Sequence, residues 1–327
     1  MNSYRTFGRI ALSAIALTLA QTALYAEDFP SRPIRMIVPF GPGTGSDVLG
    51  RVLAQKLSQQ LKQSVVIDNR PGASGAMGTD LVAHANPDGY TLTLATNATM
   101  VTFPLLSPQN VAYRADRDFT PVSYFARTSM LLLTANLPAN PKSISELITM
   151  IKAKQIPFAS NGAGTVGHLV TEAFLLNLNA KATHIAYKGS GQSHTDVLRG
   201  EVVFMTDTPA AAMANVRSGR FRPLAVTGDA RIEELPDVPT FEESGIKDMN
   251  LYAWWGIFGP PSMPAKVTRK LDSEVRVAMQ SPDFKARLRS LELQEFVMPP
   301  EKYAVFIKGE LAYWRSFLQR TGIRLDP

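Results

Sequence analysis

The sequence predicts an α/β protein with two lobes, and three observations support this class. The chain has 327 residues, which is more than one domain of roughly 100–200 residues normally holds. Strand-like and helix-like segments alternate in two successive runs, which is typical of mostly parallel sheets flanked by helices. In each run, one strand breaks into a glycine-rich loop that leads into a helix. With 45% hydrophobic and 19% charged residues, the composition is that of a folded globular protein.

The first 26 residues are typical of an export signal. Arg5 and Arg9 make the start positive, residues 10–20 are mostly apolar, and Ala26 offers a small residue for cleavage. The alternative is an uncleaved membrane anchor, but the apolar run is short for a bilayer span. We therefore expect residues 1–26 to be a signal peptide that is cleaved near Ala26, which leaves a soluble, exported mature chain.

The first run of elements predicts a βαβαβ unit. We expect its strands at residues 34–40, 64–68 and 91–96. The first two strands end in glycine-bearing turns, at residues 41–47 and 69–75. The helix after the first turn has apolar residues at spacings of three and four, and Ser46 or Asp47 can cap it. The helix after the second turn should reach about residue 85.

The pattern restarts near residue 128. Five further strands are expected, at residues 130–135, 156–160, 183–187, 202–206 and 223–227. Helices are expected at residues 144–154, capped by Ser143 or Ser145, at residues 168–178, and in a short segment ending at Arg199 and Gly200. The last third predicts helices at residues 265–279, 282–291 and 301–320, which can pack back on the first lobe. We therefore expect a discontinuous lobe 1, residues 27–127 and 228–327, and a lobe 2 of residues 128–227.

The glycine loops at residues 41–47 and 161–167 predict a site for an anion. A parallel strand ends where the next helix begins, and the first N–H groups of that helix and its dipole attract negative charge. Glycine lets a ligand approach the backbone and permits positive φ angles. One such loop is common in α/β proteins, but two loops in facing lobes predict a clamp for an anionic ligand.

A dinucleotide site is the main alternative for these loops. Residues 162–167 match the G-x-G-x-x-G fingerprint after a strand. About 20 residues further on, however, Tyr187 and Lys188 stand where an acid for the ribose is needed. In the first loop Asp68 supplies the acid, but Ser46 replaces the third glycine. Because each loop satisfies half of the fingerprint, and export separates the protein from NAD, we expect no cofactor.

Catalytic and metal-binding motifs are absent from the sequence. It has no cysteine, which excludes disulfides, thiolate metal sites and a cysteine nucleophile. The four histidines, His84, His168, His184 and His194, show no metal-ligand spacing, and no G-x-S-x-G or P-loop motif is present. The net charge of +6 is spread without a long basic run, which argues against nucleic acid as a partner. We expect no catalytic residue and no metal.

A few aromatic side chains are candidates for a pocket. His168 opens the helix after the second glycine loop, whereas His84 and His194 are expected at the surface. Trp254 and Trp255 are adjacent, and neighbours on a strand face opposite ways. One tryptophan can therefore belong to the core while the other faces a cleft.

Several longer stretches carry a family resemblance. They are PSRPIRMIVPFGPGTGSD (residues 30–47), VVIDNRPGASGAMGTDLVA (65–83), NPDGYTL (86–92), FASNGAGTVGHL (158–169), AYKGSG (186–191) and LAVTGDARIEELPDVPTFEESG (224–245). From about residue 29 to the C-terminus the chain resembles the periplasmic solute-binding receptors of tripartite tricarboxylate transporters, often called Bug receptors. The resemblance implies a two-lobed Venus flytrap, type II-like, that captures an organic carboxylate without catalysis. It also implies that the receptor delivers the ligand to membrane permease subunits.

The resemblance further implies that the ligand lies between the lobes and contacts both glycine loops. The implied contacts in lobe 1 are Phe40, Gly41, Gly43, Thr44, Gly45, Ser46, Ala73, Ser74, Gly75, Thr96 and Asn97. Those in lobe 2 are Ser160, Asn161, Gly164, Thr165, Gly167, His168, Asp207 and Thr208. In the family, backbone N–H groups and ordered waters hold the carboxylate. Asp207 either recognises an amine on the ligand or caps a helix.

The chain departs from the family pattern at two places. The family's first loop usually reads P-P-G-G-x-x-D, and this chain has two adjacent tryptophans where one is usual. Extra aromatic surface favours a flat ligand, so an aromatic acid such as terephthalate is a candidate beside aliphatic dicarboxylates. Two other functions stay open, a secreted α/β enzyme and a sensor that reports to a signalling partner. The missing nucleophile motif disfavours the enzyme.

Overall fold

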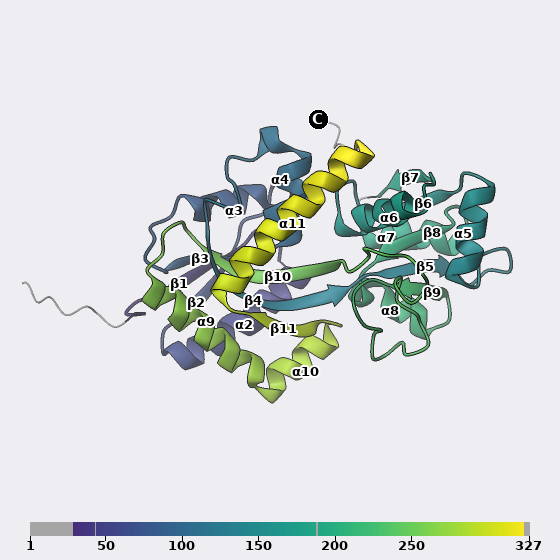
Figure 1. Cartoon of the computed structure of the whole chain (residues 1–327). Coiled ribbons are helices and arrows are strands. Elements are labelled where there is room, and N and C mark those ends of the chain that lie inside the picture. Colours follow the sequence, from purple (N-terminus) through teal and green to yellow (C-terminus); the bar gives the residue numbers. More distant parts are fainter. Residues whose placement is uncertain (1–28, 43, 188, 324–327) are drawn as a thin grey trace, which may run out of the picture.

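The computed structural model describes residues 29–42, 44–187 and 189–323. The predicted export signal lies outside these ranges, as do Gly43 and Lys188. Within them the chain forms two lobes, each built on a sheet that is flanked by helices (Figure 1). The α/β class predicted from the sequence is confirmed. No helix in the described ranges is long and apolar enough to cross a membrane.

The first lobe holds a six-stranded sheet of order β11-β4-β10-β3-β1-β2. Its strands are β1 (Ile34–Val38), β2 (Val65–Asn69), β3 (Thr91–Thr96), β4 (Thr120–Ser129), β10 (Tyr252–Gly259) and β11 (Gln294–Met298). β1 pairs in parallel with β2 and β3, whereas β10 is antiparallel to β3 and β4, and β11 is antiparallel to β4. The parallel part is the βαβαβ unit expected from the sequence, and the sheet as a whole is mixed.

The second lobe holds a five-stranded sheet of order β7-β6-β8-β5-β9. Its strands are β5 (Leu131–Ala135), β6 (Pro157–Ser160), β7 (Thr183–Ala186), β8 (Phe204–Asp207) and β9 (Phe221–Val226). β6 pairs in parallel with β7 and β8, whereas β5 is antiparallel to β8 and β9. The strands that precede the two glycine loops, β1 and β6, therefore both lie in the parallel part of a sheet.

Helices cover the faces of both sheets (Figure 1). Those around the first sheet are α2 (Gly45–Leu61), the turn η1 (Ala73–Gly75), α3 (Ala76–Ala83), the turn η2 (Ala98–Thr102), α4 (Phe103–Leu106), the turn η3 (Pro108–Asn110), α9 (Ala265–Gln280), α10 (Pro282–Ser290) and α11 (Pro300–Thr321). Those around the second sheet are α5 (Ile144–Ala153), α6 (Val166–Asn177), α7 (Ser190–Arg199) and α8 (Pro209–Arg217). The helices predicted from apolar spacing end within about two residues of these bounds.

The helix starts confirm one predicted cap and correct another. Ser143 caps α5, and its side chain accepts from the Glu146 N–H group. At α2 the expected caps, Ser46 and Asp47, are wrong, because both already lie inside the helix. Thr44 is the cap: its backbone is extended, and its side chain accepts from the Asp47 N–H group.

Two segments carry the chain between the sheets. β4 passes into β5 through the single residue Met130, and residues 227–251 lead back from β9 to β10. The buried Thr227 joins the two segments, because its Oγ1 accepts from the Met130 N–H group at 2.8 Å and donates to the Leu251 carbonyl at 2.5 Å. The long helix α11 runs across the first sheet toward the second lobe, where it contacts α6 (Figure 1).

Candidate functional site

The helices that follow the two glycine loops are capped in the same way. Thr44 (φ −69°, ψ 159°) caps α2, and Thr165 (φ −68°, ψ 160°) caps α6. Each threonine Oγ1 donates at 2.8 Å to the carbonyl of a glycine three residues earlier, Gly41 or Gly162. Each Oγ1 also accepts from the N–H group three residues later, at 3.3 Å in the first loop and 3.4 Å in the second. The two threonines therefore make the same pair of hydrogen bonds at the start of α2 and of α6.

Each turn places a helix start at the carboxyl end of a parallel strand. The first N–H groups of a helix have no acceptor inside the helix. In α2 these groups belong to Gly45 and Ser46, and in α6 to Val166 and Gly167. Together with the positive end of the helix dipole, they attract anions. A Cβ on Gly41 or Gly45 would meet nothing within 4 Å, so the space beside the first loop is open.

Ser46 lies against the second of the two adjacent tryptophans. Its Oγ accepts from the Trp255 indole N–H at 2.9 Å. Because an indole N–H can only donate, the hydroxyl hydrogen of Ser46 can still be given to another acceptor. Trp255 is partly exposed, whereas Trp254 is fully buried and packs against Tyr124 and Tyr303. As expected for neighbours on a strand, one tryptophan joins the core while the other flanks the first loop.

Other lobe 1 candidates lie at the end of β3. Thr96 is opposite Trp255 in the pairing of β3 with β10, and Asn97 donates from Nδ2 to the Tyr252 carbonyl at 3.2 Å. Thr96 and Asn97 are both buried. The side chain of Asn97 therefore anchors β10 to the loop after β3.

The turn before α3 is strained in a way that is typical of ligand sites. Gly72, Ala73, Ser74 and Gly75 all have positive φ angles, although such angles cost a non-glycine residue about 1–3 kcal/mol. Ala73 and Ser74 are exposed. A Cβ on Gly75 would lie 2.6 Å from the Thr99 side chain. Close packing behind the turn thus fixes a backbone conformation that presents Ala73 and Ser74 to solvent.

Asp47 supports the first loop from behind. Its carboxylate is only 3% exposed, accepts from Asn69 Nδ2 at 2.9 Å and pairs with Arg51 at 2.9 Å. The same Asn69 amide donates to the Phe40 carbonyl at 3.0 Å. Asp47 and Asn69 therefore hold the start of the loop, and Asn69 is a residue that the sequence did not single out.

Asp207 plays the corresponding part in the second lobe. It is 2% exposed. One oxygen accepts from Asn161 Nδ2 at 2.8 Å and from the Thr208 N–H group at 2.7 Å, and the other accepts from His194 Nε2 at 2.8 Å. Ser193 in turn donates to the Asn161 Oδ1 at 2.9 Å. Protein donors therefore occupy both carboxylate oxygens.

Two sequence-based expectations change with this network. Asp207 does not cap α8, because Thr208 accepts from the Ala211 N–H group instead. Recognition of a ligand amine by Asp207 stays a prediction, and three protein donors already bond to its oxygens. His194 was expected at the surface but is only 7% exposed. The helix α7 is polar in sequence, yet it buries the face that carries Ser193, His194 and Val197. His84, in contrast, is exposed as expected.

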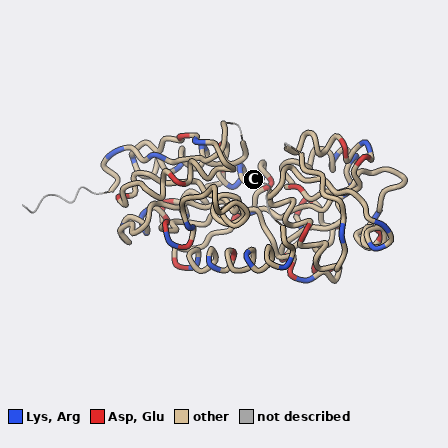
Figure 2. The backbone as a smooth tube through the Cα atoms, turned by 90° about the horizontal axis from the view of Figure 1, so that it is seen from above, with Lys and Arg blue, Asp and Glu red and all other residues tan. Residues whose placement is uncertain are grey.

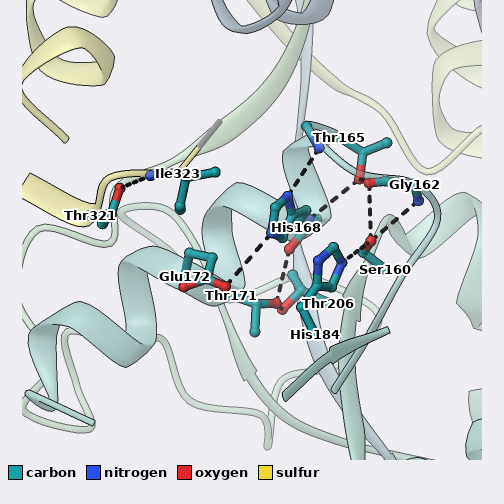
Figure 3. Close-up of polar contacts among 12 residues, drawn as sticks. Ser160, Gly162, Thr165, His168, Thr171, Glu172, His184, Thr206, Thr321 and Ile323 are labelled. Atoms are coloured by element: carbon teal, nitrogen blue, oxygen red, sulfur yellow. Dashed lines mark hydrogen bonds and ion pairs between the residues drawn. The ribbon is translucent and has the colours of Figure 1, made fainter. Parts of the chain in front are cut away.

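His168 and His184 form a stacked pair behind the second glycine loop (Figure 3). Their ring centroids are 3.8 Å apart and their planes differ by 8°. His168, 5% exposed, accepts from the Gly164 N–H group at Nδ1 over 3.0 Å. His184 Nε2 lies 2.7 Å from Ser160 Oγ. Burial, followed by the neighbouring His168, lowers the pKa of His184 to about 4. The Gly164 N–H group is therefore used inside the protein and is not free for a ligand.

Close packing also holds the start of α6 against β8. A Cβ on Gly167 would lie 2.3 Å from the Thr206 carbonyl oxygen. One turn later, Thr171 Oγ1 donates to Thr206 Oγ1 at 2.8 Å. Gly167 is thus required for the helix to approach the strand, whatever it contacts on the ligand side.

The described candidates therefore gather in two groups, one at each glycine loop. A separate cavity of about 310 Å³ is lined by residues that include Arg231, Lys285, Glu292 and Glu295. This cavity is lined by both basic and acidic side chains, and Glu292 forms an ion pair with Arg217 at 2.8 Å. The cavity therefore has no excess of donors for an anion. Among the described residues, no cluster of three or more His, Asp or Glu side chains is placed to hold a metal ion.

Comparison with known proteins defines the class to which this arrangement belongs. Residues 49–323 match the model of the tripartite tricarboxylate transporter family receptor. The chain is 34% identical over 306 residues to the protein BugT of Bordetella pertussis, an alignment that covers 92% of each chain. It is also similar to an R. palustris protein solved with adipate, with a TM-score of 0.78, 30% identity and coverage of 91% of this chain and 99% of that one. For the periplasmic binding protein BugD the TM-score is 0.74, the identity 29%, and the coverage 90% and 99%.

The fold is thus that of a two-lobed periplasmic solute receptor. The chain belongs to the tripartite tricarboxylate transporter receptor family. Its relatives are binding receptors rather than enzymes, so the alternative of a secreted α/β enzyme is discarded. The Venus-flytrap fold and the family expected from the sequence are confirmed.

Proposed function

We propose that the protein captures a dicarboxylate between lobe 1 (residues 27–127 and 228–327) and lobe 2 (residues 128–227). The twin Gly-x-Gly-Thr turns carry this proposal, because each offers a capped helix start to one carboxylate. The first lobe adds the hydroxyl hydrogen of Ser46 as a donor. No lysine or arginine is among the candidate contacts, so backbone dipoles supply the attraction. Figure 2 shows basic and acidic residues interspersed along the backbone of both lobes.

Two structural relatives indicate the class of ligand. An R. palustris protein was solved with adipate, and MatC from Rhodopseudomonas palustris, with a TM-score of 0.72 and 28% identity, was solved with malate. Both ligands are aliphatic dicarboxylates. Trp255 lies beside Ser46 and is partly exposed, so it favours a ligand with a flat aromatic ring. Terephthalate therefore belongs in the panel of acids to be tested.

The same proposal includes export and delivery. Residues 1–26 direct the chain to the periplasm and are removed near Ala26, and the loaded receptor passes its ligand to the permease subunits of a tripartite transporter. A sensor that reports the same ligand to a signalling protein is the second candidate, because receptor surfaces serve both kinds of partner. Growth of a deletion strain on the bound acid separates the two: loss of uptake supports transport, and intact uptake with lost induction supports sensing.

Calorimetry with matched acids and esters tests the binding site. At least one of adipate, malate, succinate and terephthalate should bind with micromolar or tighter affinity, about −8 kcal/mol. Its dimethyl ester should bind at least about tenfold more weakly, since it lacks the charge that the helix starts attract. Equal affinities for acid and ester would contradict an anion clamp.

A further inference from the structure

The contact between His168 and Gly164 fixes the state of the imidazole. An amide N–H can only donate, so His168 Nδ1 must be an unprotonated acceptor, and the ring is neutral with its hydrogen on Nε2. A doubly protonated imidazole has no acceptor and cannot make this bond. The bond closes the second glycine loop at a residue with a φ angle of +77°.

Side chains from three elements contact the His168 ring. On its own helix, Glu172 Oε1 lies 3.7 Å from Nε2. From β7, His184 stacks on the ring, and from β6, Phe158 and Ser160 contribute no charge. Figure 3 draws the uncharged Thr321, the last residue of α11, and Ile323 just beyond it, and the charged Arg320 lines a cavity with Asn177, more than two turns further along α6 than His168.

We propose, on the basis of the proposed function, that His168 is a positioning residue for the carboxylate ligand. Its neutral imidazole holds Gly164 in place, and this directs the free N–H groups of Val166 and Gly167 toward the ligand. Loss of this acceptor releases the Gly164 N–H group and weakens binding. The side chain thus acts through the loop and need not touch the ligand.

Two substitutions distinguish the effect of the hydrogen-bond acceptor from the effect of ring packing. His168→Asn places an amide oxygen at about the distance of Nδ1 from the backbone, so it keeps the acceptor and loses the stack. His168→Phe keeps a ring against His184 and Phe158 but has no acceptor. Binding that depends on the acceptor survives in the asparagine variant, whereas binding that depends on packing survives in the phenylalanine variant.

The test uses the mature protein and both variants, with adipate and malate as probes at about pH 8. We expect His168→Asn to bind within about threefold of the wild type and His168→Phe about tenfold more weakly. Normal binding by His168→Phe with weak binding by His168→Asn would overturn the inference.

A ligand-free measurement keeps this result separate from the proposed function. The amide hydrogen of Gly164 should be protected from solvent exchange in the wild type and in His168→Asn, and exposed in His168→Phe. Equal protection in all three proteins would overturn the positioning role even if adipate binds. If protection follows the acceptor but neither acid binds the wild type, the positioning of the loop stands and the proposed ligand class fails.

Discussion

Two buried carboxylates, Asp47 and Asp207, stand directly behind the glycine loops. Each is nearly inaccessible, and each accepts from an asparagine amide, Asn69 in the first lobe and Asn161 in the second. Buried charges are tolerated only when hydrogen bonds satisfy them. Both acids therefore support the loops, and the proposed ligand contacts are the backbone N–H groups in front of them.

Removing the charge of Asp207 should destabilise the second lobe. In Asp207→Asn, the three donors lose a charged acceptor, and the new amide N–H group either faces one of them or requires His194 to change tautomer. We expect the free energy of unfolding in urea to fall by about 1–3 kcal/mol. The exposed Asp116→Asn is the matched control and should change little. A variant of normal stability that had lost affinity for amino dicarboxylates alone would contradict the supporting role.

His184 should make stability depend on pH. Its folded pKa is about 4 because burial, and then His168, disfavour its charged form, whereas an unfolded histidine titrates near about 6.5. Stability should therefore be fully present above about pH 6.5 and fall as the pH drops to about 4, because the unfolded state binds the proton first. Since the ring is partly exposed, we expect a loss of about 1–2 kcal/mol rather than the full value of the shift.

Urea unfolding between about pH 7 and about pH 4.5 checks this dependence. His184→Gln keeps a hydrogen-bonding partner for Ser160 but cannot titrate, so its stability should change less over the range. Parallel profiles for the two proteins would show that another group carries the pH dependence.

At the scale of elements, the capped helix starts connect stability to binding. Thr44→Val and Thr165→Val each remove an N-cap and the bond to a glycine carbonyl, and each should lower the free energy of unfolding by about 1 kcal/mol. Both should also weaken carboxylate binding. Ser143→Ala removes the cap of α5, which belongs to neither glycine loop, so it should lower stability to a similar extent and leave affinity unchanged. Loss of affinity in all three variants would point to a general effect of stability.

The sequence predicted the strands that end in glycine-bearing turns and the helices that have apolar residues at helical spacing. The strands around both loops were found because each ends in a turn that only certain residues can make. The antiparallel β4 and β11 lack such turns and were not expected. The pairing of Asp207 with His194 was also missed, because α7 is polar in sequence and its buried face depends on partners from other elements. The Gly-x-Gly-Thr repeat was visible in the sequence, but its shared hydrogen bonds were not.

On the scale of the whole molecule, two chain segments connect the lobes that carry the glycine loops. The chain passes between the sheets at Met130 and again through residues 227–251, and Thr227 bonds to both segments. Each lobe carries its own loop with its own buried acid. In the proposed function, one ligand contacts both loops and so links the lobes, which favours a loaded state that a partner can recognise.

The most direct test of this account is a titration of the nitrogen-15-labelled mature protein with adipate, in which the amide signals of Ser46 and Gly167 are followed together. If one dicarboxylate spans the two helix starts, both signals should shift with the same midpoint and reach saturation at one ligand per chain. A response confined to one loop, or one centred on the separate cavity around Arg231 and Glu292, would contradict the two-lobe clamp.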